Sequence, residues 1–185
     1  MVTGGAGYVG SHTVLELLDS GYRVVVLDNL VAGFRWAVDP RAAFVEGCVE
    51  GDLLVQRLLR DHDVRGILHF AGSTIVEESV RDPLKYYRNT AAANRSLLES
   101  AVAERVRHFV YSSTAAVYGP AGPDPVSEDA ALRPATPYGR SKLMTECMLE
   151  DVAGSYPFNY CARLGQGESA EPLRRGGVFV NTAQI

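Results

Sequence analysis

Apolar runs and amphipathic stretches alternate along the 185 residues of the chain. Runs rich in β-branched residues predict strands at 22–28, 43–46, 66–71, 108–113 and 158–162, after a strand stub at 1–3. Apolar positions three and four apart, such as Val14, Leu17 and Leu18, predict helices at 10–20, 52–62, 83–106 and 137–153. Strands that alternate with helices favour right-handed βαβ units. The sequence therefore predicts an α/β fold with a doubly wound parallel sheet.

The pattern weakens at both ends of the chain. Only about three residues precede the first glycines, whereas a strand usually has five or six, so we expect a first strand that is cut short. Residues 165–185 are polar and rich in glycine, apart from an apolar burst at 178–180. We therefore expect one organised domain over residues 1–164 and an irregular tail over residues 165–185.

Composition narrows the class of protein. A hydrophobic fraction of 46% supports a buried core, and a formal net charge of −4 argues against a nucleic-acid partner. No apolar run approaches the roughly 18 residues of a membrane span, so no membrane partner is expected. The three cysteines (Cys48, Cys147 and Cys161) are scattered, which favours reduced thiols and a cytoplasmic location. The four histidines lack metal-ligand spacing, so no metal site is expected.

The first motif, VTGGAGYVGSH, lies between a predicted strand and a predicted helix and contains four glycines: Gly4, Gly5, Gly7 and Gly10. Glycine allows a positive φ and leaves the backbone bare for a ligand, and the N-terminus of the following helix attracts a pyrophosphate. Binding of a dinucleotide also needs a carboxylate at the end of the second strand, which accepts hydrogen bonds from the ribose hydroxyls. Asp28 lies at that position. A glycine-rich turn without a ligand is the alternative. Because Asp28 would repel a 2′-phosphate, this Rossmann-type pattern favours NAD over NADP.

The second motif combines SSTAAVYG with PYGRSK. Residues 112–114 lie at the C-terminal end of a predicted strand, where open α/β sheets bind their ligands, and they include Ser112 and Thr114. Tyr138 and Lys142 are four residues apart and share one face of a predicted helix. A nearby ammonium favours the phenolate of a tyrosine, and the Thr114 hydroxyl can share a proton with a sugar hydroxyl. These residues suit proton removal from an alcohol, although a chance Tyr-x-x-x-Lys match is the alternative.

These motifs resemble the extended short-chain dehydrogenase/reductase superfamily and, within it, the UDP-glucose 4-epimerase family. The matching stretches are VTGGAGYVGSHT, VVVLDNL, HFAGSTIVEESVRDPLKYYRNT, FVYSSTAAVYG and PYGRSKLMTE. The resemblance implies an isomerase of galactose and nucleotide-sugar metabolism that interconverts UDP-glucose and UDP-galactose. In that family NAD oxidises C4, the 4-keto sugar rotates, and the hydride returns to the other face.

The resemblance also implies a role for particular residues. The cofactor set comprises Gly4, Gly7, Tyr8, Val9, Gly10, Asp28, Asn29, the backbone at Val49, Phe70, Ala71, Gly72, Thr74, Asn89, Ser112, Tyr138 and Lys142. Tyr138 would be the acid and base, and Lys142 its partner and a ligand of the nicotinamide ribose. Thr114 and Tyr138 would contact the substrate at the 4-hydroxyl. Members dimerise through the helices at 83–106 and 137–153, so a homodimer is expected.

The chain departs from the family pattern at several places. Cys48 replaces an acid that contacts adenine, and Thr74 replaces a lysine found in some members. The RYFN stretch after the sixth strand and the substrate domain are missing, so we expect an incomplete chain. Because of Cys48 and the loss of RYFN, we expect it to bind NAD less tightly than a full-length member does.

Two alternatives to the epimerase remain. One is a non-catalytic NAD-binding remnant. The other is a nucleotide-sugar 4,6-dehydratase, although that family has an Asp-Glu pair where this chain has Ala115 and Ala116.

Overall fold

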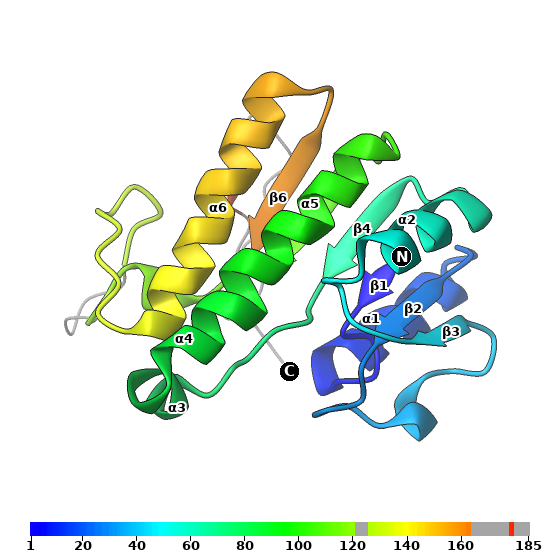
Figure 1. Ribbon diagram of the computed structural model, residues 1–185, viewed down its shortest axis with the longest axis horizontal. Helices are drawn as coiled ribbons and strands as arrows, with labels where there is room; N and C mark the ends of the chain where they lie inside the picture. The colour runs from blue at the N-terminus through cyan, green and yellow to red at the C-terminus, as the bar shows by residue number, and fades with distance from the viewer. Residues whose placement is uncertain (121–125, 164–177, 180–185) are drawn as a thin grey trace. The chain divides into compact units, whose positions relative to one another are not determined.

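The structure, a computed structural model, describes residues 1–120, 126–163 and 178–179 (Figure 1). The chain divides into two compact units. Unit 1 comprises Met1–Gly72 and Ser96–Val110, and unit 2 comprises Ser73–Arg95 and Tyr111–Ile185. Most of the tail expected at 165–185 lies outside the described residues. So does the end of the segment after the sixth strand, where the family has RYFN and this chain does not.

Unit 1 contains β1 (Val2–Thr3), α1 (Tyr8–Asp19), β2 (Val25–Asp28), the 3₁₀ turn η1 (Arg35–Ala37), β3 (Ala43–Glu46), α2 (Asp52–Asp61) and β4 (Gly66–His69). Most of α5 (Ala93–Ala103) and the start of β5 (His108–Ser112) also belong to it. The strand order is β3-β2-β1-β4-β5. β1 pairs in parallel with both β2 and β4, and β2 pairs in parallel with β3. The predicted doubly wound parallel sheet is therefore confirmed.

The core of unit 1 follows from the β-branched run of the second strand. All four residues of β2 are buried, because a parallel strand is covered on both faces. Val26 packs in one cluster with Val2 of β1 and Val14 of α1, and all three are fully buried. Each such side chain contributes roughly 1.5–3 kcal/mol through apolar area removed from water. This packing fixes the chain between β1 and α1, where the glycines lie.

Unit 2 contains α3 (Val76–Arg81), α4 (Pro83–Tyr86), the π-helical segment η2 (Tyr87–Ala92), the end of β5, the 3₁₀ turn η3 (Ala115–Val117), α6 (Pro137–Ser155), β6 (Asn159–Arg163) and β7 (Val178–Phe179). Its strand order is β5-β6-β7, and β6 pairs in parallel with β7. Thr136 caps α6, because its hydroxyl accepts the Gly139 N–H at 3.2 Å, and Pro137 follows at a first-turn position. α6 runs alongside β6 and also packs against α3, α4, η2 and η3 (Figure 1).

The prediction of one continuous α-helix over residues 83–106 is wrong. Asp82 and Pro83 do begin a helix, as the sequence predicts, but it becomes a π-helix over η2 and α5 ends at Ala103. The short helix α3 was not predicted. It is held to α4 by the Tyr86 hydroxyl, whose oxygen lies 2.5 Å from the Ile75 main-chain oxygen and 2.8 Å from Glu78 Oε2, so that its one proton is shared between these two acceptors. Such tertiary contacts leave no signal in a local hydrophobic pattern.

The second strand is also shorter than predicted, because it begins at Val25 rather than at residue 22. The Tyr22 N–H donates to the Leu17 main-chain oxygen at 2.9 Å and so belongs to the end of α1. Gly21 adopts φ +84°, which confirms it as the residue that ends this helix.

Candidate functional site

The glycine loop of unit 1 is a tight turn that only glycine can form at two of its positions. Gly4 adopts φ +71°, and a Cβ there would lie 2.6 Å from the main-chain nitrogen of Ala71. A Cβ on Gly10 would lie 2.1 Å from the Gly4 oxygen, well inside contact distance. Gly7 differs, since a Cβ there would meet only the Gly4 oxygen, at 3.4 Å. Gly7 therefore leaves backbone bare toward open space, as close approach by a ligand requires.

The start of α1 suits an anion. Gly7 is the N-cap and offers no side-chain cap, and the first turn contains no acidic residue. The first N–H groups of a helix have no partner within the helix, and here they include those of Tyr8 and Val9. Both side chains are exposed. The residues present thus fit a dinucleotide pyrophosphate at this helix end.

Asp28, at the end of β2, is fastened to the same loop. Its Oδ2 accepts the Ala6 N–H at 2.9 Å, and its Oδ1 accepts the Leu30 N–H at 2.8 Å. The side chain is buried, at 8% exposure. Each carboxylate oxygen can accept a further hydrogen bond, so ribose hydroxyls remain possible partners. Asp28 therefore also shapes the glycine loop, a role that the sequence did not reveal.

Other predicted cofactor residues of unit 1 surround this turn. The Phe70 N–H donates to the Thr3 oxygen at 2.9 Å, which brings the end of β4 beside the first strand. The Asn29 amide donates to the sulfur of Cys48 at 3.7 Å and accepts the Val31 N–H at 3.2 Å. Val49 is half-buried next to Cys48, and Gly72 ends this part of the unit with φ +147°.

Five predicted cofactor residues belong to unit 2, and two of them, Thr74 and Asn89, lie before β5. Thr74 is exposed. Asn89 lies in η2, and its amide donates to the Ser73 hydroxyl at 3.2 Å. The cofactor role of Asn89 stays a prediction.

Tyr138 and Lys142 lie on the buried face of α6, as their spacing predicts. The Lys142 ammonium donates to the main-chain oxygen of Ser112 at 2.8 Å and lies 4.9 Å from the centre of the Tyr111 ring. Burial lowers the pKa of Lys142 to about 8, because a low-dielectric environment disfavours the charged form. At neutral pH most of the amine is still protonated. The Tyr138 ring meets the Tyr86 ring edge-on, with centroids 6.3 Å apart.

Thr114 follows Ser112 by two residues and is the N-cap of η3. Its hydroxyl oxygen accepts the Ala116 N–H at 3.2 Å, which caps this turn. Among the described residues, no hydrogen bond joins the Tyr138 phenol, the Lys142 amine and the Thr114 hydroxyl to one another. The structure thus brings Lys142 directly onto Ser112, whereas contacts between Tyr138 and Thr114 remain a prediction.

Glu146 was not predicted as a functional residue. It is buried one helical turn after Lys142, and its Oε1 accepts a hydrogen bond from the Ser113 hydroxyl. Burial raises the pKa of this carboxyl. The sequence held a signal for it, because an acid four residues after Lys142, a predicted site residue, shares its helix face.

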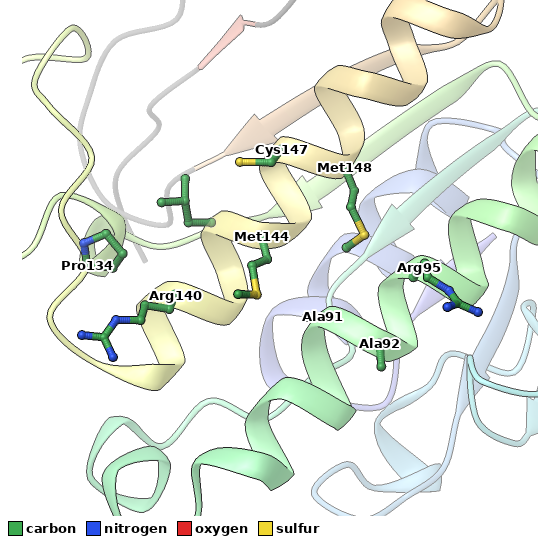
Figure 2. A pocket seen from close by; sticks show the side chains of 9 residues that line it. Ala91, Ala92, Arg95, Pro134, Arg140, Met144, Cys147 and Met148 are labelled. Atoms are coloured by element: carbon green, nitrogen blue, oxygen red, sulfur yellow. The ribbon is translucent and has the colours of Figure 1, made fainter.

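A separate groove of about 530 Å³ lies on unit 2, between α6 and the segment that carries Ala91 and Ala92 (Figure 2). Met144 and Met148 line it from α6, with Arg140 at one end and Arg95 from α5. Tyr138 and Lys142 do not line it, so this groove is distinct from the candidate proton-transfer residues.

Comparison with known proteins identifies the family. The sequence profile of the NAD dependent epimerase/dehydratase family matches residues 1–171. The chain belongs to this family. A UDP-glucose 4-epimerase of Azospirillum brasilense is 47% identical over 178 residues, which is 96% of this chain and 51% of that protein. The chain thus spans about half the length of the epimerase relatives it matches.

Solved structures of the epimerase/dehydratase family agree with the fold. The UDP-glucose 4-epimerase of Brucella ovis, in complex with NAD, superposes with a TM-score of 0.85 at 40% identity, over 89% of this chain and 51% of that chain. A dTDP-glucose 4,6-dehydratase of Streptomyces venezuelae, also with NAD bound, has a TM-score of 0.82 at 32% identity, over 88% of this chain and 54% of that chain. Fold likeness therefore extends to both reaction classes of the family.

In the parts of the chain placed by the structure, no helix is both long and apolar enough to cross a membrane. Within the same residues, no group of three or more histidine, cysteine, aspartate or glutamate side chains is arranged to hold a metal ion.

Proposed function

We propose that this chain is the NAD-binding part of a UDP-glucose 4-epimerase, an isomerase of galactose and nucleotide-sugar metabolism. Residues 1–164 would form its cofactor domain. The observation that carries the proposal is the attachment of Lys142 to the Ser112 oxygen, at the end of β5 and one turn beyond Tyr138. A buried ammonium held there favours a tyrosine phenolate that can take a proton from a sugar hydroxyl.

The proposed cofactor residues divide by chemistry. The N–H groups of Tyr8 and Val9 would bind the pyrophosphate, and Asp28 and Asn29 the adenosine ribose. The glycine loop supports this assignment, because Gly7 leaves the backbone bare and the carboxylate of Asp28 can accept further hydrogen bonds. When bound, NAD would supply the hydride acceptor for C4 and the donor that returns the hydride.

The proton chemistry is assigned to the residues of unit 2. Tyr138 would accept the proton of the sugar 4-hydroxyl during oxidation and return it during reduction. Thr114 would share a hydrogen bond with that hydroxyl, since its oxygen already accepts an N–H but its own proton can be donated. Lys142 would bind the nicotinamide ribose and favour the phenolate.

A 4,6-dehydratase is the second candidate, because a structure of that class resembles this chain. Elimination needs an acid and a base beside the sugar. The two residues after Thr114 are Ala115 and Ala116, which have no titratable group. This favours epimerisation over dehydration. The third candidate is a non-catalytic NAD-binding remnant, which applies if the chain does not act together with a substrate-binding half.

Two further proposals concern the whole protein. We propose a homodimer formed by the helices over 83–106 and 137–153, where the groove lined by Met144 and Met148 offers an apolar surface. We also propose a cytoplasmic location, supported by the exposed thiols of Cys48 and Cys147.

The test is to join this chain to the second half of an epimerase of the same family, with the missing stretch restored. The product should convert UDP-galactose into UDP-glucose and should give no dehydrated 4-keto-6-deoxy sugar. Formation of the dehydrated sugar would support the second candidate instead. A folded chimera that binds NAD but catalyses neither reaction would support the remnant.

A further inference from the structure

Glu146 is a buried acid with no role in the proton transfer proposed above. It is 6% exposed and lies one helical turn after Lys142 on α6. Its Oε1 accepts from the Ser113 hydroxyl, and Ser113 is itself buried. Its Oε2 is also buried, and no described residue provides it with a hydrogen-bond partner. Buried carboxylates are rare, and a buried oxygen without a hydrogen-bond partner lowers the stability of the fold. A functional role would explain why Glu146 is buried.

The titratable groups on which the Glu146 charge acts come from α6, β5, β6 and the segment after η3. They are Lys142 and Cys147 of α6, Tyr111 of β5, Tyr118 after η3 and Tyr160 of β6. For the thiol and the three phenols, burial first and the Glu146 charge after it raise the pKa, so these groups stay neutral at neutral pH. Lys142 is the one cation among these groups. Only its charged form gains from a negative Glu146.

Glu146 and Lys142 are tied to consecutive residues rather than to each other. Lys142 donates to the Ser112 oxygen, and Glu146 accepts from the Ser113 hydroxyl. Two successive turns of α6 are therefore attached to two successive residues where β5 ends. The acid can act on Lys142 both through its charge and through the backbone it holds.

We propose that Glu146 is a positioning residue that, with Ser113, holds the end of β5 against α6 and supplies the buried negative charge that retains Lys142 as an ammonium ion. The inference rests on the proposed role of Lys142 beside Tyr138. Burial lowers the pKa of Lys142, and the Glu146 charge acts in the opposite direction. Without that charge, more of the lysine would be neutral at neutral pH, and a neutral amine gives a phenolate little support.

The chain has two lysines, Lys85 and Lys142, so lysine labelled with ¹³C at Cε gives two NMR signals whose pH titrations are separable. Lys85→Arg assigns them. In the unsubstituted chain the Lys142 signal should titrate near pH 8, and in Glu146→Gln it should titrate at a lower pH. Glu150→Gln removes the same charge from an exposed position of α6, where solvent screens it, and should leave the midpoint unchanged.

Ser113→Ala provides an independent route, because it keeps the acid but removes its hydrogen-bond donor. The carboxylate is then less favoured, and the Lys142 midpoint should fall, by less than in Glu146→Gln. Circular dichroism checks that each variant is folded, and Ser113→Ala decides the question if Glu146→Gln is not. A folded variant whose Lys142 midpoint stays constant or rises, with Lys85 unchanged, would overturn the proposal. The titration uses neither NAD nor a UDP-sugar, so its failure is distinct from failure of the proposed function.

Discussion

The Nζ atom of Lys142 lies 2.8 Å from the main-chain oxygen of Ser112. This bond joins the buried face of α6 to the end of β5, the edge where parallel sheets bind their ligands. It keeps a cation in a buried position, where burial lowers the pKa of the lysine to about 8. A proton-transfer role gives a reason for burying this charge. A structural role alone does not, because apolar side chains of similar volume stabilise a core as well or better.

The pH dependence of stability should report this buried lysine. Its pKa falls from the ordinary 10.5 to about 8 on folding. Below pH 8 the lysine is protonated in both states, whereas between pH 8 and 10.5 the unfolded chain holds a proton that the folded chain has released. Stability should therefore rise with pH in this window, by about 1.5 kcal/mol between pH 8 and 9.5 relative to Lys142→Met. Urea unfolding at the two pH values measures the difference.

Lys85→Met is the matched control for that experiment. Lys85 is about a third exposed and pairs with Glu78 at 2.5 Å. Its removal should leave the slope between pH 8 and 9.5 as in the unsubstituted chain. An equal slope in Lys142→Met and in the unsubstituted chain would show that the lysine is not buried as described.

The glycine loop should tolerate no methyl group at Gly10. A Cβ there would lie 2.1 Å from the Gly4 oxygen, so Gly10→Ala should lower the free energy of unfolding by about 1–3 kcal/mol. Gly154 provides the opposite case, because it lies in α6 with nothing within 4 Å of a Cβ. Gly154→Ala should raise stability by up to about 1 kcal/mol. Thermal unfolding of both variants checks the pair, and a loss of similar size in both would contradict the loop geometry.

Asp28→Ala should weaken NAD binding more than NADP binding, because the carboxylate favours ribose hydroxyls and repels a 2′-phosphate. Loss of an interaction of this kind corresponds to roughly a 10–100-fold lower NAD affinity. Titration calorimetry with both cofactors measures the ratio. Asp39→Ala is the control, since Asp39 also accepts a main-chain N–H in unit 1, at 2.9 Å from Arg41. Equal losses for NAD and NADP in Asp28→Ala would refute the role assigned to its charge.

The proposed homodimer should depend on the groove of unit 2. Met144 is 48% exposed there, so Met144→Arg should place a charge in an apolar interface and yield monomers. Leu53→Arg changes an equally apolar but more exposed side chain of unit 1 and should leave assembly unchanged. Light scattering at tens of micromolar distinguishes the outcomes. A monomeric unsubstituted chain at that concentration would argue against the dimer.

Strong local periodicity made much of the fold predictable. The β-branched run that ends at Asp28 is a buried strand, and Gly21 ends the preceding helix as expected. The π-helical turn over η2 and the helix α3 were not predictable, because they depend on long-range contacts such as Tyr86 with the Ile75 oxygen.

The candidate site, like the fold, was predictable only in part. The Tyr138–Lys142 spacing gave a shared helix face, which the structure confirms. The attachment of Lys142 to a main-chain oxygen and of Asp28 to two main-chain N–H groups could not be read from residue types. Backbone groups are present at every position, so only the folded chain determines which of them a side chain meets.

The proposed proton transfer is tested by Tyr138→Phe in the chain joined to an epimerase substrate half. Removal of one hydroxyl should lower the rate of UDP-galactose conversion by at least about 100-fold, because general acid–base catalysis contributes that much or more. NAD affinity should remain within about twofold, and Tyr156→Phe, which changes an exposed tyrosine after the end of α6, should have no effect on the rate. A Tyr138→Phe chimera that converts UDP-galactose as fast as the unsubstituted chimera would contradict the proposed mechanism.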